Sequence, residues 1–171
     1  MEKLNALEYD SDFQGYIDLA LNKNIDINQC LKVSLEESNI FFNQVPIEKQ
    51  LFKYAEKKWT IKEILQHIID TERILSYRVL RIVRNDKTKI PGFDENLYVA
   101  NSNANQRNMD DLFHEFIEVR RSTISLFKGI SDRSLSSIGN AGGKNISVRA
   151  LGYIISGHLL HHINIIKQRY L

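Results

Sequence analysis

The chain has 171 residues, which suits one domain with a buried core, and its hydrophobic fraction of 43% is ordinary for a globular protein. The formal net charge is only +2 and the basic residues are spread along the chain, which argues against a nucleic-acid or anionic-membrane partner. No apolar run approaches the roughly 18 residues that a membrane span requires.

Two features bear on the cellular compartment. The segment from Met1 to Phe13 is acidic and lacks the apolar stretch of a signal peptide. Cys30 is the only cysteine, so an internal disulfide is excluded and a reducing compartment is the default. We therefore expect a cytoplasmic protein in which Cys30 acts as a small buried hydrophobic residue.

The first long helix is predicted over residues 26–44, after a shorter helical segment at 12–21 that can pack over one end. Asp26 can cap the long helix. The Val45-Pro46 pair ends it, because proline disfavours helical geometry in the residue before it.

The second long helix is predicted over residues 60–84. Thr60 and Glu63 have the spacing of a capping box, and Trp59 and Ile64 can form a hydrophobic staple around it. Its apolar residues recur with helical period, so this segment should bury one face.

Two further helices follow. One begins near Asn108 with Asp110 and Asp111 in its first turn, where acidic residues are favoured, and Gly129 is suited to end it. The last begins near Ser147, after a Gly142-Gly143 turn, and runs to the C-terminus.

These patterns predict an all-α four-helix bundle that forms a single domain over residues 1–171. No segment alternates with period two, so no sheet is expected. A helix over 60–84 is about 37 Å long at 1.5 Å per residue. The link over 85–107 can span that length, so the second and third long helices could lie parallel, joined by a crossover.

His158 and His162 are four residues apart on the apolar stripe of the last helix. On a helix this spacing places them about 40° apart and one turn from each other, so the two imidazoles can chelate one metal ion. The alternative is a hydrogen-bonded pair of core histidines, and this helix alone leaves both readings open.

His67, at the edge of the stripe on the second long helix, favours metal. A three-histidine site leaves a coordination position for water or substrate, as catalytic zinc sites do. His161 lies on the flank of the stripe, which suits a pocket wall or a residue supporting the ligands. His114 stands beside charged residues and is expected in solvent.

The acid-base group is not evident from the sequence. Leu159 occupies the place of the catalytic glutamate in the H-E-x-x-H metalloprotease motif. Asp70 and Glu72, about one turn after His67, are possible pocket residues. We favour a solvated position for Asp70 and, for Glu72, an ion pair with Arg73 or Arg78.

Four stretches of the sequence resemble the DinB superfamily, and its YfiT-like branch in particular. They occur in the family's order and the resemblance covers about Tyr54 to the C-terminus; the stretches are Trp59–Ile64, His67–Arg73, Pro91–Asn96 and Gly157–His162.

The resemblance implies a four-helix bundle with up-down-down-up order and a histidine triad. Position by position, the triad falls on His67, His158 and His162. One divalent metal ion, zinc or nickel, is usual in the family, and relatives often carry an acidic residue where Leu159 stands here. Members with known activity include thiol-dependent S-transferases and related isomerases.

We expect a metal-dependent hydrolase or thiol-dependent transferase that acts on a small molecule or a low-molecular-weight thiol. The alternatives are a non-catalytic metal or ligand-binding module that responds to stress, and a bundle with a purely structural metal. The crossover, including Tyr98 and Arg107, either covers the mouth of the site or is an ordinary solvated link.

Three apolar residues lie off the main helical stripes, namely Leu80, Leu160 and Ile163. They could form a homodimer interface between two bundles. Alternatively, they cover the N-terminal segment or the crossover.

Overall fold

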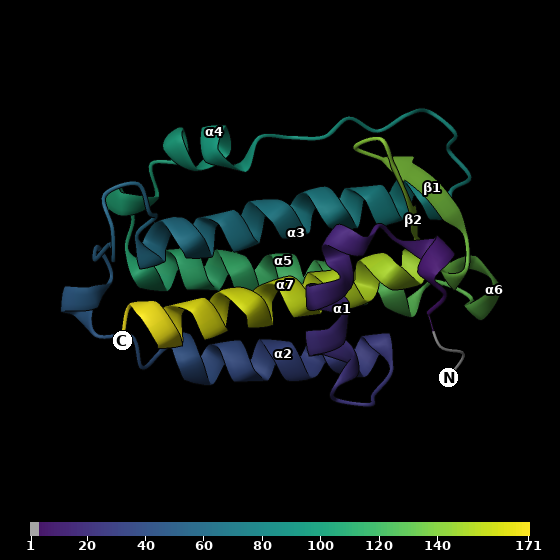
Figure 1. Ribbon diagram of the computed structural model, residues 1–171. Helices are drawn as coiled ribbons and strands as arrows, with labels where there is room; N and C mark the ends of the chain where they lie inside the picture. The colour runs from purple at the N-terminus through teal and green to yellow at the C-terminus, as the bar shows by residue number, and fades with distance from the viewer. Residues whose placement is uncertain (1–3) are drawn as a thin grey trace.

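The computed structural model describes residues 4–171, so the first three residues of the N-terminal segment considered above lie outside it. Four long helices carry the fold (Figure 1): α2 (Ile27–Phe42), α3 (Ile61–Val83), α5 (Met109–Lys128) and α7 (Val148–Arg169). Shorter helices are α1 (Gln14–Leu21), α4 (Glu95–Ala100) and α6 (Asp132–Leu135). Single 3-10 turns occur at Ala6–Glu8, Ser11–Phe13, Ile47–Lys49 and Ala104–Gln106.

Helices α2 and α3 begin at the capping residues that the sequence predicted, Asp26 and Thr60. The Thr60 side chain accepts a hydrogen bond from the Glu63 amide, and the Glu63 carboxylate accepts one from the Thr60 amide, which completes the capping box of α3. The Asp26 side chain caps α2 by accepting a hydrogen bond from the Gln29 amide, and the Ser147 side chain caps α7 by accepting one from the Ala150 amide. Each cap satisfies a backbone amide that lacks a partner within the helix. The cap therefore fixes the residue at which the helix begins, and with it the position of each histidine along the helix.

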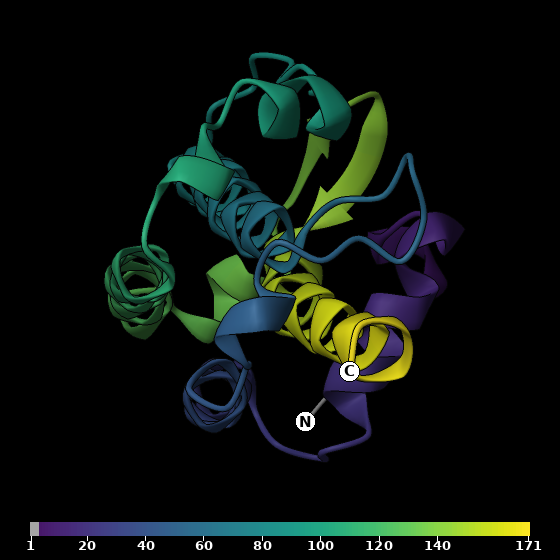
Figure 2. The ribbon, with the colours of Figure 1, turned by 90° about the vertical axis from the view of Figure 1, so that its left-hand side faces the viewer.

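The view down the bundle in Figure 2 shows α7 between α2 and α3, with α1 on the outer side of α7. Helices α3 and α5 run in the same direction, because their contacts advance together: Arg73 bonds to Glu115, and Ser76 bonds to Thr123. Figure 1 shows the intervening segment passing along α3 through α4. That segment returns to the start of α3, where Lys62 donates a hydrogen bond to the Arg107 carbonyl oxygen.

A small sheet corrects the expectation that no strands occur. Strand β1 (Ile138–Ala141) pairs antiparallel with β2 (Lys144–Ser147). The turn between them uses Gly142 and Gly143, with φ of +63° and +82°, which glycine adopts without steric penalty. Strands of four residues are too short for an alternating pattern to stand out in the sequence.

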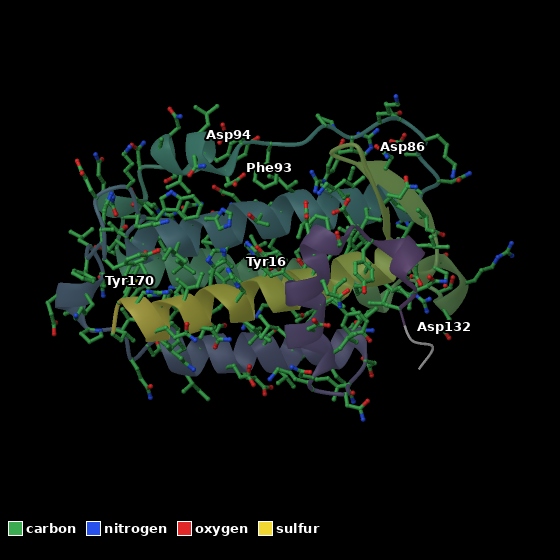
Figure 3. All side chains as sticks on the ribbon, viewed as in Figure 1. Tyr16, Asp86, Phe93, Asp94, Asp132 and Tyr170 are labelled. Carbon is green, nitrogen blue, oxygen red and sulfur yellow. The ribbon has the colours of Figure 1, made fainter. Side chains whose placement is uncertain are left out.

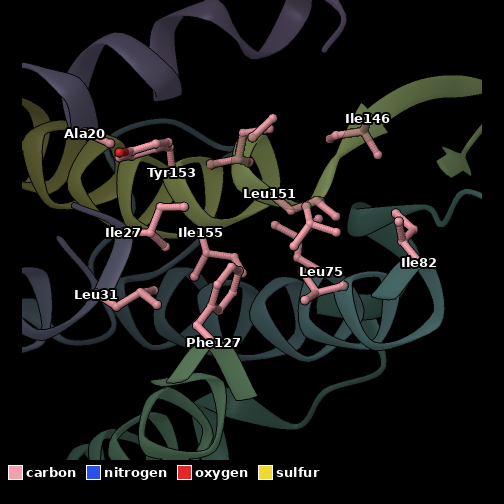
Figure 4. Packing of buried hydrophobic residues seen from close by; sticks show 14 of the residues in the cluster. Ala20, Ile27, Leu31, Leu75, Ile82, Phe127, Ile146, Leu151, Tyr153 and Ile155 are labelled. Carbon is pink, nitrogen blue, oxygen red and sulfur yellow. The ribbon is translucent and has the colours of Figure 1, made fainter. Parts of the chain in front are cut away.

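The core consists of two clusters of buried apolar residues. One lies around Leu75, Leu151 and Ile155, and part of it is drawn in Figure 4. The other gathers around Phe116 and Leu159. Along α7, His158 stands between Ile155 of the first cluster and Leu159 of the second.

The three apolar residues that were predicted to lie off the main helical stripes differ in burial. Ile163 is only 4% exposed and belongs to the second core cluster, so it cannot serve a dimer interface. Leu80 is exposed and Leu160 is half-buried.

Within residues 4–171, no helix combines the length and the apolar character needed to cross a membrane.

Candidate metal centre

Three histidines from two helices meet inside the bundle. His67 lies in the second turn of α3, and His158 and His162 lie one turn apart on α7. Each side chain is buried, with exposed fractions of 7–8%. The contact between α3 and α7 therefore brings together residues that are distant in the sequence.

The ring nitrogens of the triad converge. The Nε2 atom of His158 lies 3.0 Å from Nε2 of His67 and 3.0 Å from Nε2 of His162. The candidate ligand atoms of all three residues lie within 4.8 Å of one another. Nitrogens bound at about 2.0–2.1 Å to one tetrahedral zinc ion would stand about 3.3 Å apart, which is close to the two 3.0 Å distances that His158 makes.

Hydrogen bonding alone does not account for two such contacts. A neutral imidazole nitrogen is either a donor or an acceptor, so Nε2 of His158 can form a normal hydrogen bond with only one of its two neighbours. The second contact would then be the weaker part of a three-centre bond in which His158 shares its one proton or its one lone pair. One cation instead accepts a lone pair from each of the three imidazoles, so the donor set fits a divalent metal ion.

Burial keeps the imidazoles in the form that binds metal. Desolvation lowers the pKa of His67 to about 4, with a smaller contribution from His161. The pKa values of His158 and His162 are also well below 6.5, first because of burial and then because of neighbouring histidines. Neutral imidazole is the metal ligand, so the triad is ready to bind metal at neutral pH.

Two aromatic residues that the sequence reasoning did not assign to the site pack against the triad. Trp59 lies 4.8 Å from the His67 ring, measured between centroids. Tyr16 of α1 meets His158 edge-on at 5.4 Å. Trp59 was already placed beside the α3 cap, but nothing in the sequence indicates that α1 crosses α7 at the triad.

The two remaining histidines differ in position. His161 is half-buried, with its ring 5.1 Å from that of His162 and 5.2 Å from that of Tyr16. It therefore borders the triad without joining the group whose nitrogens converge. His114 is exposed on α5, on a helix that contributes no member of the triad.

Three predicted pocket residues line one cavity of about 530 Å³ between α3 and the crossover: Asp70, Tyr98 and Arg107. Asp70 is partly buried, which corrects the expectation of a solvated side chain. It accepts a hydrogen bond from Gln66 at 2.9 Å, and desolvation raises its pKa above the usual value. Arg107 donates a hydrogen bond to Gln66 at 3.0 Å.

Glu72 does not take part in that cavity, and the predicted ion pair with Arg73 or Arg78 is wrong. Its carboxylate is buried and receives two hydrogen bonds from Arg120 of α5, at 2.7 and 2.9 Å. Arg120 is fully buried and also donates to Ser34 of α2. A bidentate pair of this kind joins three helices, so Glu72 is part of the framework.

Leu159 is fully buried in the second core cluster. The position next to the first histidine of α7 therefore carries a packing residue, and no acid-base group stands there. Any such group in this chain comes from another element.

Comparisons with known proteins agree with the fold. The family model of the DinB superfamily matches residues 31–166. Among solved structures, the chain is similar to YfiT from Bacillus subtilis, with a TM-score of 0.67, 14% identity, and coverage of 98% of this chain and 90% of that one. YfiT is described as a probable metal-dependent hydrolase with an unusual four-helix bundle topology. No curated protein matches the sequence.

Proposed function

The chain belongs to the DinB superfamily, and on this premise we propose that it is a metal-dependent enzyme that hydrolyses a small molecule or transfers a low-molecular-weight thiol to one. The observation that carries this proposal is the convergence of three buried imidazoles, His67, His158 and His162. The description of YfiT as a probable metal-dependent hydrolase supports the hydrolytic form. The thiol-transfer form rests on the family resemblance alone.

The three histidines would hold one divalent ion, and zinc or nickel suits a set of imidazole ligands. Such an ion would act as a Lewis acid and lower the pKa of a coordinated water or thiol toward neutrality. Within the described residues, the group of convergent ligands contains these three members and no carboxylate or thiol. Structural zinc sites are usually closed by four protein ligands, so a three-histidine set favours an open site.

The remaining residues define what the protein itself contributes. Burial holds the imidazoles neutral, and the Trp59 and Tyr16 rings limit the access of water to His67 and His158. The cavity beside α3 offers Asp70, Tyr98 and Arg107 to a polar substrate. The lining of this cavity includes no member of the triad, and its mixture of apolar and polar groups suits a small-molecule ligand.

Activity that depends on the triad tests the proposal. Protein loaded with zinc or nickel should hydrolyse a model ester, or join a small thiol to an electrophile, and chelation should abolish this turnover. His158→Ala should do the same, whereas His114→Ala, which replaces an exposed histidine, should not. Stoichiometric metal without turnover of either class of substrate would favour a non-catalytic binding module instead.

A further inference from the structure

Helix α1 lies outside the residues that match the family model, yet it packs directly on the candidate metal centre. The contact is made at Gly157 of α7. A Cβ atom at this position would lie 1.8 Å from the carbonyl oxygen of Tyr16, so only glycine allows the two backbones to approach this closely. Gly157 immediately precedes His158, and the contact therefore fixes α1 beside a member of the triad.

This approach brings the Tyr16 side chain to the histidines. Its ring lies 5.4 Å from that of His158 and 5.2 Å from that of His161, edge-on in both cases. In Figure 3 the labelled Tyr16 lies near the region where α1, α3 and α7 meet. The side chain is half-buried, so part of it remains accessible to a small molecule.

The Tyr16 hydroxyl forms no hydrogen bond with any residue from 4 to 171, in contrast to the hydroxyls of Tyr9 and Tyr170. The Tyr9 hydroxyl donates to Gln14, and that of Tyr170 donates to the Trp59 carbonyl oxygen. A phenolic hydroxyl is protonated at neutral pH, so it can donate a hydrogen bond to a bound molecule.

We propose that Tyr16 is a substrate-contacting residue whose hydroxyl donates a hydrogen bond to an oxygen atom of the molecule bound at the triad. This inference rests on the proposed function and narrows its substrate class to carbonyl compounds such as esters and amides. In these compounds the oxygen gains negative charge during hydrolysis, and a preorganised donor stabilises that charge. A metal-bound sulfur accepts a longer and weaker hydrogen bond than an oxygen of similar charge does, so it would gain less from the same hydroxyl.

Ligand binding to cobalt-loaded protein tests the proposal without any assay of turnover. Acetohydroxamate presents oxygen acceptors, and ethanethiol presents sulfur. Tyr16→Phe keeps the ring and removes the hydroxyl. We expect this variant to bind cobalt normally, to bind acetohydroxamate about fivefold to tenfold more weakly, as for one lost hydrogen bond, and to lose less affinity for ethanethiol than for acetohydroxamate. Tyr77→Phe, at an exposed position on α3, is the matched control and should behave as the wild type.

A second variant separates hydrogen bonding from packing. Tyr16→Leu removes both the ring and the hydroxyl. If Tyr16→Phe shows the full loss of acetohydroxamate affinity and Tyr16→Leu adds little, the hydrogen bond is supported. If only Tyr16→Leu weakens binding, Tyr16 acts through packing and the proposal is overturned, while cobalt binding and the response to ethanethiol still support the metal centre. Failure of the wild type to bind cobalt would overturn both.

Discussion

Nε2 of His67 and Nε2 of His158 lie 3.0 Å apart, although 91 positions separate the two residues in the chain. Both side chains are buried, so bulk water does not separate the two nitrogen atoms. His162 meets the same nitrogen of His158 at the same distance. Burying polar groups without partners costs free energy, and a bound cation is the arrangement that pairs all three at once.

The first prediction concerns metal content. Protein purified without chelator should carry up to one zinc, nickel or similar divalent ion per chain, because the triad is neutral and convergent. His158→Ala should abolish this binding, since His158 contacts both other members. Elemental analysis measures the content, and His114→Ala is the control. Full occupancy in the His158 variant would show that the metal lies elsewhere.

The second prediction concerns removal of the metal. Chelation should leave the helical circular dichroism nearly unchanged, because two apolar clusters hold the helices together without an ion. The melting temperature should fall only modestly, since a ligand stabilises the native state by mass action. If chelation unfolds the protein, as it does zinc fingers, the metal is structural and the enzyme proposal loses its main support.

Local signals in the sequence located the four long helices, and contacts across the bundle decided what the sequence could not. Asp26 and Thr60 predicted helix starts because a cap depends on residues within one turn. The partner of Glu72 was assigned to a neighbour on the same helix, yet it is Arg120, 48 positions away. A carboxylate next to several arginines in sequence gives no indication of which arginine packing will bring to it.

The histidines show the same difference between local sequence signals and contacts across the bundle. The spacing of His158 and His162 placed them on one helix face, whereas the inclusion of His67 depended on which helix packs against α7. The position of Tyr16 at the triad could not be predicted from the sequence, because the only local sign of the contact between α1 and α7 is a glycine inside a helix. A glycine inside a helix costs about 1 kcal/mol of free energy relative to alanine, so Gly157 indicates a close approach without identifying the partner.

The third prediction concerns the buried pair between Glu72 and Arg120. Glu72→Ala should lower the free energy of unfolding by about 3–5 kcal/mol, because it leaves the Arg120 guanidinium buried without its counter-charge. Urea denaturation followed by circular dichroism measures this loss. The exposed pair of Arg121 and Glu118 provides the control, since Glu118→Ala should change stability by less than about 1 kcal/mol. Equal effects at the two sites would contradict a structural role for Glu72.

The fourth prediction is a loss of stability at alkaline pH. Burial raises the pKa of Tyr170 to about 12, and its hydroxyl donates to the Trp59 carbonyl oxygen. A tyrosine whose pKa is raised by folding contributes stability that is complete below pH 10, its ordinary value, and is lost as pH rises toward 12. The loss should be on the order of 2 kcal/mol.

Tyr170→Phe isolates this contribution. Denaturation with urea at pH 9 and pH 11 should show a smaller decline in stability for this variant than for the wild type. Tyr77→Phe, at an exposed position, should keep the wild-type decline. An identical pH dependence in the Tyr170 variant would mean that this hydroxyl does not hold the C-terminal helix to Trp59.

The last prediction follows from the packing of α1 on α7. Gly157→Ala would place a methyl group 1.8 Å from the Tyr16 carbonyl oxygen, and backbone atoms of a helix cannot move aside as a flexible side chain does. We expect α1 to be displaced, the free energy of unfolding to fall by about 1–3 kcal/mol, and amide protons of α1 to exchange faster.

Gly15→Ala is the matched control for this substitution. Gly15 lies in α1 itself, a Cβ there meets nothing within 4 Å, and alanine favours helix by about 0.5–1 kcal/mol. The control should therefore be neutral or stabilising, although it makes the same chemical change on the same pair of packed helices. If Gly157→Ala were equally harmless, α1 would not be held against His158, and Tyr16 could not contact a molecule bound at the triad.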